Sequence, residues 1–141
     1  MDLVLNDPEN GFYSTGKLKI GQYGDFCTSP SLGSDFARLL AIQVVDWFHD
    51  LEKSEIGFEL FSLVEIGPGE GTLSRDLILA VGEIAPALIN KIEIVLVELN
   101  AGMRERQEKV VNKLEGINCR WSNIEDLILR PVTGVIVANE V

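Results

Sequence analysis

The hydrophobic pattern of the chain changes character near residue 60. From there on, short continuous apolar runs alternate with segments in which apolar residues recur every three or four positions. The runs predict buried strands, and the spaced segments predict helices that pack one face against a sheet. The predicted strands cover residues 61–66, 92–99, 117–121 and 135–138, and the predicted helices cover residues 72–81, 100–114 and a short stretch before Pro131. Because strands that alternate with helices form parallel sheets with right-handed crossovers, the pattern predicts an α/β fold.

The N-terminal part of the chain has a different pattern. Residues 1–33 are rich in Gly, Asp, Asn and Pro, and such a composition predicts a loop-rich segment. Residues 34–51 predict a helix with Ser34 as its N-cap. The apolar stripe of this helix consists of Phe36, Leu40, Val44, Trp47 and Leu51. We therefore divide the chain into an N-terminal segment with a helix, residues 1–58, and an α/β unit, residues 59–141.

Single residues predict where the helices begin and end. Gly82 is expected to end the helix that starts at Thr72, because glycine is common just after a helix. Asn100 is expected to cap the next helix through its side-chain oxygen. Ser122 and Glu125 have the spacing of a capping box and predict the start of a short third helix.

The charge of the chain bears on its partners. Twelve Lys and Arg residues against 22 Asp and Glu residues give a formal net charge of −10. This charge repels the phosphates of nucleic acids, and it favours a cationic ligand or a basic partner. No apolar run approaches the ~20 residues that a membrane span needs, so no membrane insertion is predicted. Residues 1–7 lack the basic start and apolar core of a secretory signal, and we expect an intracellular protein.

The sequence has few residues that could bind a metal ion or take part in redox chemistry. Cys27 and Cys119 lie far apart without a CxxC partner, and His49 is the only histidine. This pattern predicts no metal site. Two buried free thiols are expected, with a single disulfide as the alternative.

A glycine-rich turn, residues 67–71, follows the first predicted strand. Glycine lets the backbone turn sharply and approach a ligand closely, and the next helix offers free N–H groups at its start. Many strand-to-helix turns are glycine-rich for packing alone, so this signal is weak by itself. Glu98 strengthens it, because an acid at the end of the second strand can accept hydrogen bonds from both ribose hydroxyls in this architecture. The alternative for Glu98 is a solvated carboxylate at the end of a strand.

Three features favour S-adenosylmethionine over a nicotinamide dinucleotide as the ribose-containing ligand. The dinucleotide fingerprint has a glycine where this loop has Thr72. Glu98 follows Gly71 by 27 residues, whereas that fingerprint has about 20. Glu65 and Glu70 place negative charge beside the loop, which repels a pyrophosphate and suits an ammonium and a sulfonium group. A methyltransferase is therefore favoured over an oxidoreductase.

Six segments carry a resemblance to a known family. They are residues 7–14, 24–30, 36–43, 64–73, 97–100 and 138–140. In this order, and over nearly the whole chain, they resemble the MidA-type methyltransferases. That family includes a mitochondrial complex I assembly factor with arginine methyltransferase activity. Residues 24–30 are the specific part of the match, since the glycine loop is shared by all class I methyltransferases.

The resemblance implies a Rossmann-like class I methyltransferase fold and S-adenosylmethionine as cofactor. Gly67, Gly69 and Gly71 are implied to line the methionine end of the cofactor. Glu65 is implied to lie near its ammonium group, and Glu98 to hold its ribose.

Further roles follow from the same resemblance. Trp121 and Ser122 are implied to flank the adenine, and for Trp121 a core aromatic is an equal alternative. Asp25, Thr28 and Ser29 are implied to belong to a lid over the cofactor, with ordinary turn chemistry as the alternative.

Asn139 and Glu140 follow the last predicted strand, which ends beside the transferred methyl group in this architecture. The pKa of a guanidinium lies above ~12, so the group is charged at neutral pH. A carboxylate that binds and orients it helps to direct its nitrogen at the methyl group. The resemblance thus implies Asn139 and Glu140 as catalytic residues. The alternative is that they are polar residues at a strand end.

Members of the family are longer than this chain, and class I methyltransferases have seven strands where the pattern here gives four. The resemblance therefore implies an N-terminal fragment, in which residues 59–141 form the first half of the domain. Either the first or the fourth strand is expected to have an uncovered edge through which an oligomer can form. A complex I core subunit is the implied protein substrate. The implied compartment is a bacterial cytoplasm, or the mitochondrial matrix in a eukaryote. A non-catalytic module that binds a protein partner is the alternative function.

Overall fold

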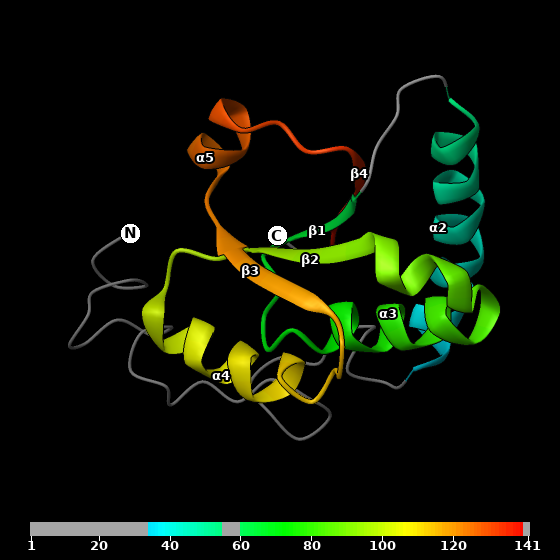
Figure 1. Cartoon of the computed structure of the whole chain (residues 1–141). Coiled ribbons are helices and arrows are strands. Elements are labelled where there is room, and N and C mark those ends of the chain that lie inside the picture. Colours follow the sequence, from blue (N-terminus) through cyan, green and yellow to red (C-terminus); the bar gives the residue numbers. More distant parts are fainter. Residues whose placement is uncertain (1–33, 55–59, 140–141) are drawn as a thin grey trace.

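A computed structural model describes residues 34–54 and 60–139 of the chain (Figure 1). The predicted alternation of strands and helices is confirmed. The helices are α2 (Asp35–Lys53), α3 (Thr72–Ile84), the 3₁₀ helix η2 (Pro86–Lys91), α4 (Ala101–Val111) and α5 (Ile124–Leu129). The strands are β1 (Phe61–Ile66), β2 (Ile92–Val97), β3 (Asn118–Ser122) and β4 (Gly134–Ala138).

The four strands form one parallel sheet in the order β3-β2-β1-β4. The chain first adds strands on one side of β1, as far as β3, and then returns to place β4 on the other side. Strand order therefore reverses at β1, and in open α/β sheets ligands bind at such a point, outside the carboxyl ends of the strands. The order also decides between the two strands expected at an edge: β1 is interior, and the described sheet has its edges at β3 and β4.

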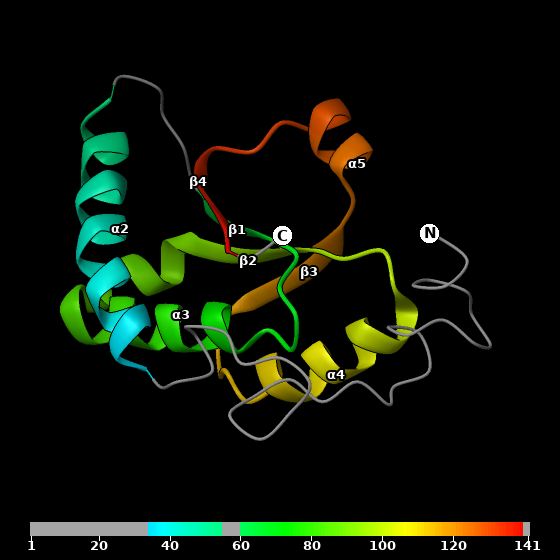
Figure 2. The same cartoon turned by 180° about the vertical axis from the view of Figure 1, so that it is seen from behind.

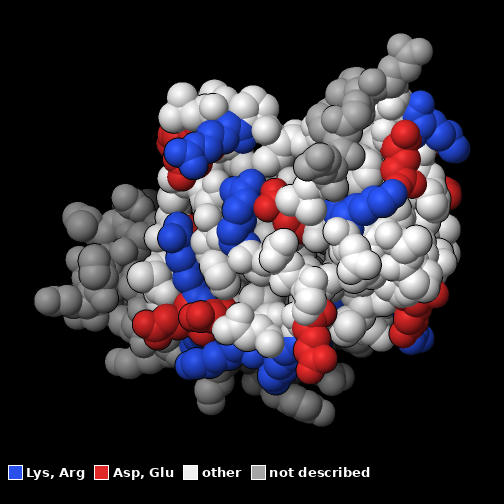
Figure 3. Space-filling view, viewed as in Figure 1, with Lys and Arg blue, Asp and Glu red and all other residues white. Residues whose placement is uncertain are grey.

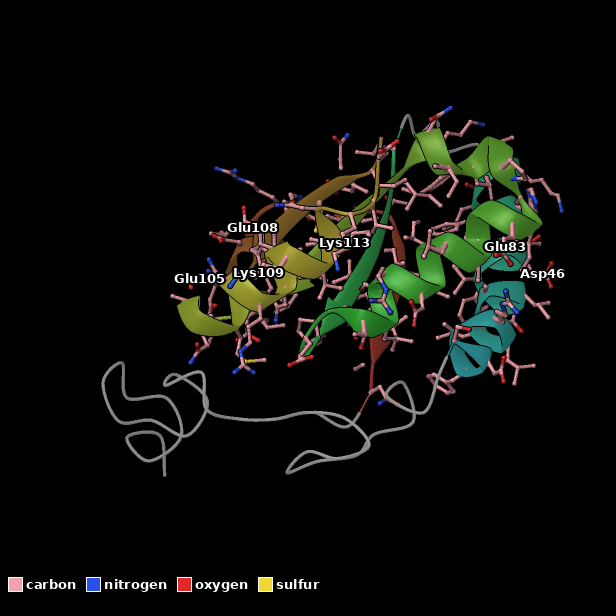
Figure 4. The ribbon with its side chains drawn as sticks, turned by 90° about the horizontal axis from the view of Figure 1, so that it is seen from below. Asp46, Glu83, Glu105, Glu108, Lys109 and Lys113 are labelled. Carbon is pink, nitrogen blue, oxygen red and sulfur yellow. The ribbon has the colours of Figure 1, made fainter. Side chains whose placement is uncertain are left out.

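Helices cover both faces of the sheet, and the larger core lies on the face of α3 and α4. Figure 1 shows α3 and α4 below the sheet and α5 above it, and Figure 4, seen from below, shows α3 and α4 in front of the strands. Phe61, Leu63, Ile94 and Leu96 are buried on the α3 side. On the other face, a smaller cluster is formed by Val64, Val95, Val97, Ile66, Leu127 and Val132. This arrangement is the one expected for a parallel sheet, whose strands are apolar on both sides.

Helix α2 packs through most of the predicted stripe: Val44 is buried, and the partly buried Phe36, Leu40 and Leu51 pack against the core. Its buried residues are Ala37, Ala41, Val44, Val45 and Phe48. Trp47 keeps 45% of its surface exposed, whereas the Phe48 ring lies 5.5 Å from that of Phe61. Ala37 and Ala41 are buried in the core as well, so the buried face includes small side chains that the predicted stripe leaves out. Ser34 makes no side-chain cap hydrogen bond, because its backbone is already helical.

Several element boundaries differ from the predictions. Gly82 lies inside α3, and a Cβ there would lie 3.2 Å from Cδ1 of Ile89, so the glycine makes room for η2. The second strand ends at Val97 and the helix after it ends at Val111. Asn100 caps that helix as predicted, since its Oδ1 accepts a hydrogen bond from the Met103 N–H at 3.1 Å.

The predicted capping box is displaced by one residue. Ser122 is the last residue of β3, and its hydroxyl donates to the backbone oxygen of Asn123 at 3.3 Å. Asn123 is the N-cap of α5, where its Oδ1 accepts from the Asp126 N–H at 2.7 Å. Asn is as good a cap as Ser, and the β3 ladder extends far enough to include Ser122.

Surface features add little to the functional picture. Acidic and basic side chains lie beside one another over the face shown in Figure 3. Within residues 34–54 and 60–139, no helix is long and apolar enough to cross a membrane, and no cluster of His, Cys, Asp and Glu is arranged to hold a metal. Cys119 is a half-buried free thiol whose pKa burial raises to about 11, and Cys27 lies outside the described residues.

Candidate functional site

The predicted site residues converge on the carboxyl edge of the sheet. Ile66, the last residue of β1, is in register with Val97 on one side and with Ala138 on the other. The segments that follow these strands are therefore neighbours, and they contain the glycine loop, Glu98 and Asn139. Gly67 donates its N–H to the Val97 oxygen at 3.4 Å, which holds the start of the loop against β2.

Each of the three glycines in the loop has a left-handed backbone. Gly67, Gly69 and Gly71 have φ values of 64°, 52° and 79°. Residues with a Cβ lose roughly 1–2 kcal/mol in this conformation, so the loop specifically requires glycine. Gly71 is the N-cap of α3 and donates its N–H to the Pro68 oxygen at 2.7 Å. The result is a tight turn that presents bare backbone at the start of a helix.

Glu65 is buried beneath this loop. Its side chain is 4% exposed, and its Oε2 accepts a 3.1 Å hydrogen bond from the Ser74 N–H and a very short one from the Ser74 hydroxyl. Burial raises the pKa of Glu65 to about 7, although the bonds from Ser74 act in the opposite direction. The carboxyl group thus faces α3, so direct contact with a ligand stays a prediction.

Glu98 has both carboxylate oxygens in hydrogen bonds. Oε1 accepts from the Asn100 N–H at 2.9 Å, and Oε2 accepts from Nε2 of Gln107 at 3.1 Å. The guanidinium of Arg104 holds the backbone oxygen of Glu98, with Nε at 2.7 Å. The side chain is half-buried, and its orientation is therefore fixed by two adjacent segments. Each carboxylate oxygen has a second acceptor site, which leaves capacity for two hydroxyl groups.

Gln107 is a residue that the sequence analysis missed. It lies on α4, is fully buried, and donates from Nε2 to the Gly69 oxygen at 2.7 Å as well as to Glu98. Its Oε1 accepts from the indole N–H of Trp121 at 2.8 Å. A signal was present in the sequence, because Met103, Gln107 and Val111 recur every four residues and form the buried face of α4. A glutamine between two apolar residues of a core-facing stripe needs buried polar partners.

Trp121 and Ser122 lie at the end of β3. Trp121 is half-buried against the main core, beside Leu96 in the sheet, and its indole points to Gln107. Ser122 is buried, and its backbone oxygen accepts from the Glu98 N–H at 3.3 Å. The structure thus places Trp121 against the core and one hydrogen bond away from Gln107, which holds Glu98. Whether it also flanks an adenine stays a prediction.

The charge beside the loop is partly balanced. Nη1 of Arg106 lies 3.5 Å from Oε1 of Glu70, and burial favours a proton on Glu65. The two acids therefore contribute less negative charge than their number indicates. Asn139 follows β4 and is half-buried, whereas Glu140, Asp25, Thr28 and Ser29 lie outside the described residues.

Comparison with known proteins identifies the family. Residues 39–141 match the model of a family described as "Putative S-adenosyl-L-methionine-dependent methyltransferase". The chain belongs to this methyltransferase family. The match covers most of the chain and includes the whole sheet edge described above, and it agrees with the resemblance to MidA-type methyltransferases.

Two relatives illustrate the range of the methyltransferase family. The human protein arginine methyltransferase NDUFAF7, which is mitochondrial, is 34% identical over 114 residues, covering 80% of this chain and 25% of the human protein. A Burkholderia thailandensis protein crystallised with S-adenosyl-homocysteine is 28% identical, with a TM-score of 0.76 over 99% of this chain and 35% of that protein. The chain thus spans about a quarter to a third of the length of these relatives. The structural match confirms the Rossmann-like class I methyltransferase fold.

The residues at the sheet edge fit S-adenosylmethionine. Gly67 is exposed and Gly69 is half-buried, so an amino acid group can approach the backbone there, whereas Gly71 is buried (Figure 2 shows the loop between β1 and α3). Glu98 is held from two sides and keeps acceptor capacity for the two ribose hydroxyls. We find no residue among those described whose chemistry conflicts with this cofactor.

Proposed function

We propose that the described residues form the S-adenosylmethionine-binding part of a protein arginine methyltransferase. The observation that carries this proposal is the fixed carboxylate of Glu98 beside the left-handed glycine loop. In this role, Glu98 holds the ribose, and Gly67, Gly69 and Gly71 receive the methionine end. The bound cofactor supplies an electrophilic methyl group.

The remaining site residues act around these two anchors. Glu65 lies below the loop with its carboxyl group buried against Ser74, and in its deprotonated form it favours the ammonium group. Trp121 and Ser122 limit the space for the adenine at the end of β3. Asp25, Thr28 and Ser29 belong to the lid, within an N-terminal segment and helix at residues 1–58. These roles follow from the family resemblance.

Arginine is the acceptor that we propose. Relatives that are 34% and 35% identical are named protein arginine methyltransferases. Asn139 follows the strand beside the glycine loop, and Glu140 is the next residue in the sequence, so we propose that these two residues orient the guanidinium. The pKa of a guanidinium lies above ~12, so its proton is hard to remove at neutral pH. We therefore expect the carboxylate to contribute more by orienting the guanidinium than by removing its proton. The protein substrate that we propose is a core subunit of respiratory complex I.

The compartment of the protein follows from its source. In a eukaryote, we propose the mitochondrial matrix, because the named relatives are mitochondrial. In a bacterium, the corresponding compartment is the cytoplasm.

Calorimetric titration with S-adenosylmethionine, S-adenosyl-homocysteine and NAD tests the proposed cofactor. We expect saturable binding of the first two and none of NAD. Tight binding of NAD, or no binding of S-adenosyl-homocysteine by the folded chain, would overturn the proposal and favour an oxidoreductase or a non-catalytic module.

The Glu98→Gln variant sharpens this test. The amide has one acceptor oxygen in place of two, so it loses part of the hydrogen bonding both to a ribose and to Asn100 and Gln107. Hydrogen bonds to charged groups are strong, and we expect the affinity for S-adenosyl-homocysteine to fall about 10- to 100-fold. Glu108→Gln is the matched control, because Glu108 is exposed on α4 (Figure 4). Equal affinity losses in the two variants would contradict the role of Glu98.

A further inference from the structure

Gln107 connects three parts of the candidate site that the sequence places far apart. Its side chain bonds to Gly69 in the loop after β1, to Glu98 after β2 and to Trp121 in β3. Each of these partner groups can act only as a donor or only as an acceptor in its hydrogen bond with Gln107. The Gly69 carbonyl and the Glu98 carboxylate accept, whereas the indole N–H donates, so the orientation of the amide is fixed by its surroundings.

The burial of Gln107 makes these hydrogen bonds consequential. The residue has 0% of its surface exposed, so water cannot replace a lost partner. Among the described residues, no buried side-chain nitrogen or oxygen lacks a hydrogen-bond partner. A shift of the loop, of Glu98 or of Trp121 would therefore break a hydrogen bond that has no substitute.

We propose that Gln107 is a positioning residue of the cofactor site, whose amide sets the glycine loop, the ribose-binding carboxylate and the β3 aromatic in their relative places. This proposal rests on the proposed function. Gln107 is covered by protein and acts through Glu98 and Gly69. Gly71 lies beside the same side chain, since a Cβ there would be in van der Waals contact with Cγ of Gln107 at 3.5 Å. Helix α4 is thus part of the site, although none of its side chains is implied to touch the cofactor.

A double-mutant cycle separates positioning from stability. S-adenosyl-homocysteine is titrated into the wild-type chain, Gln107→Met, Glu98→Gln and the double variant, at a temperature where circular dichroism shows each to be folded. Methionine keeps the length of the side chain and removes its three hydrogen bonds. We expect Gln107→Met to weaken binding about tenfold or more. In the Glu98→Gln background, we expect the further loss to be smaller, because the part of the effect that passes through the hydrogen bond between Gln107 and Glu98 is already weakened.

Val111→Ala is the matched control for stability. Val111 is 3% exposed on the same buried face of α4, and it belongs to the core. Its truncation is expected to lower stability while leaving the affinity for S-adenosyl-homocysteine within about twofold in both backgrounds. The proposal is overturned if Gln107→Met binds as the wild type does, or if its loss is the same in both backgrounds and matches that of Val111→Ala.

Two further variants keep the test decisive if Gln107→Met does not fold. Gln107→Glu preserves the shape but places a second carboxylate against Glu98, and we expect at least a tenfold loss of affinity. Trp121→Phe removes the indole N–H together with the five-membered ring that carries it, and it is expected to lower the affinity about two- to threefold. Unchanged affinity in both variants overturns the proposal. Failure of the wild-type chain to bind overturns the proposed cofactor function, and the positioning role with it, whereas binding that is insensitive to Gln107 overturns the positioning role alone.

Discussion

The buried carboxyl group of Glu65 couples folding to pH. Its pKa is raised by burial from an ordinary value of 4.5 to about 7, so between these two values the folded chain binds more protons than the unfolded chain. The contribution of this group to the free energy of unfolding therefore falls as the pH rises through that window, and is constant above it. A bound cation near Glu65 would oppose this loss.

We predict that Glu65→Gln removes this pH dependence. The amide keeps an acceptor for Ser74 and carries no charge. Urea unfolding followed by circular dichroism, at a series of pH values between about 4.5 and 8, measures the stability of the wild type relative to the variant. This difference should fall up to a pH of about 7 and then level off. Glu108→Gln is the control, and an equal slope in it and in Glu65→Gln would contradict the prediction.

Single residues also show how far the sequence predicts the site. Glu98 could be located because it follows a continuous apolar strand, and the glycines because their spacing implies a tight turn. Gln107 could not, because its partners come from three elements whose proximity depends on the completed sheet. For the same reason, Trp47 and Phe48 could not be distinguished: both are large and apolar, and only the packing of α2 against α3 decides which is buried.

At the scale of elements, the contact between β1 and β4 depends on Gly134. A Cβ at this position would lie 1.8 Å from the backbone oxygen of Ser62, its partner in the ladder. Backbone cannot move aside as a flexible side chain can. Strand β4 is therefore able to lie at this place in the sheet only with a glycine at its first position.

We predict that Gly134→Ala displaces β4 from the sheet. Overpacking of this kind costs about 1–3 kcal/mol or more, and here it acts on the backbone itself. Hydrogen exchange should show faster exchange of the β4 amides that bond to β1. Gly82→Ala is the control, because its Cβ would meet only the side chain of Ile89. Full protection of β4 in Gly134→Ala would show that the strands can absorb the added methyl group.

The existence of each strand and helix was predicted better than the residues at which it begins and ends. Residues 61–66 form a strand as predicted, because an apolar run stops at a glycine turn. The run after Ile92 extends to Leu99 in the sequence, but Leu99 is 77% exposed and the strand ends at Val97. Because Leu99 is apolar, the predicted strand was longer than the observed one, whose ladder with β3 ends at Val97.

At the scale of the whole molecule, exposed apolar side chains coexist with a high net charge. Ile128, Leu129 and Ile136 are 72%, 78% and 62% exposed, on α5 and on β4, which is an edge strand of the described sheet. Open strand edges and apolar patches favour association. The net charge of −10 opposes it through repulsion between copies, and salt screens that repulsion.

We predict that self-association of this chain increases with ionic strength. Sedimentation velocity over a range of protein and salt concentrations measures it. Ile136→Thr should reduce association, whereas Ile84→Thr, at an exposed position on α3, should not. A single monomeric species under all conditions would contradict the prediction, since the exposed apolar residues of α5 and β4 would then not mediate self-association.

The sheet order also governs how the chain assembles. The pairs β1–β2 and β2–β3 join strands that are consecutive in the chain, whereas the β1–β4 ladder joins Ser62 to Gly134 across β2, β3 and all the helices from α3 to α5. Closing so long a loop costs more chain entropy, so β4 should dock last, as a slow step. Asn139 would then reach the end of β1 only at that final step, after the glycine loop and Glu98 have already come together.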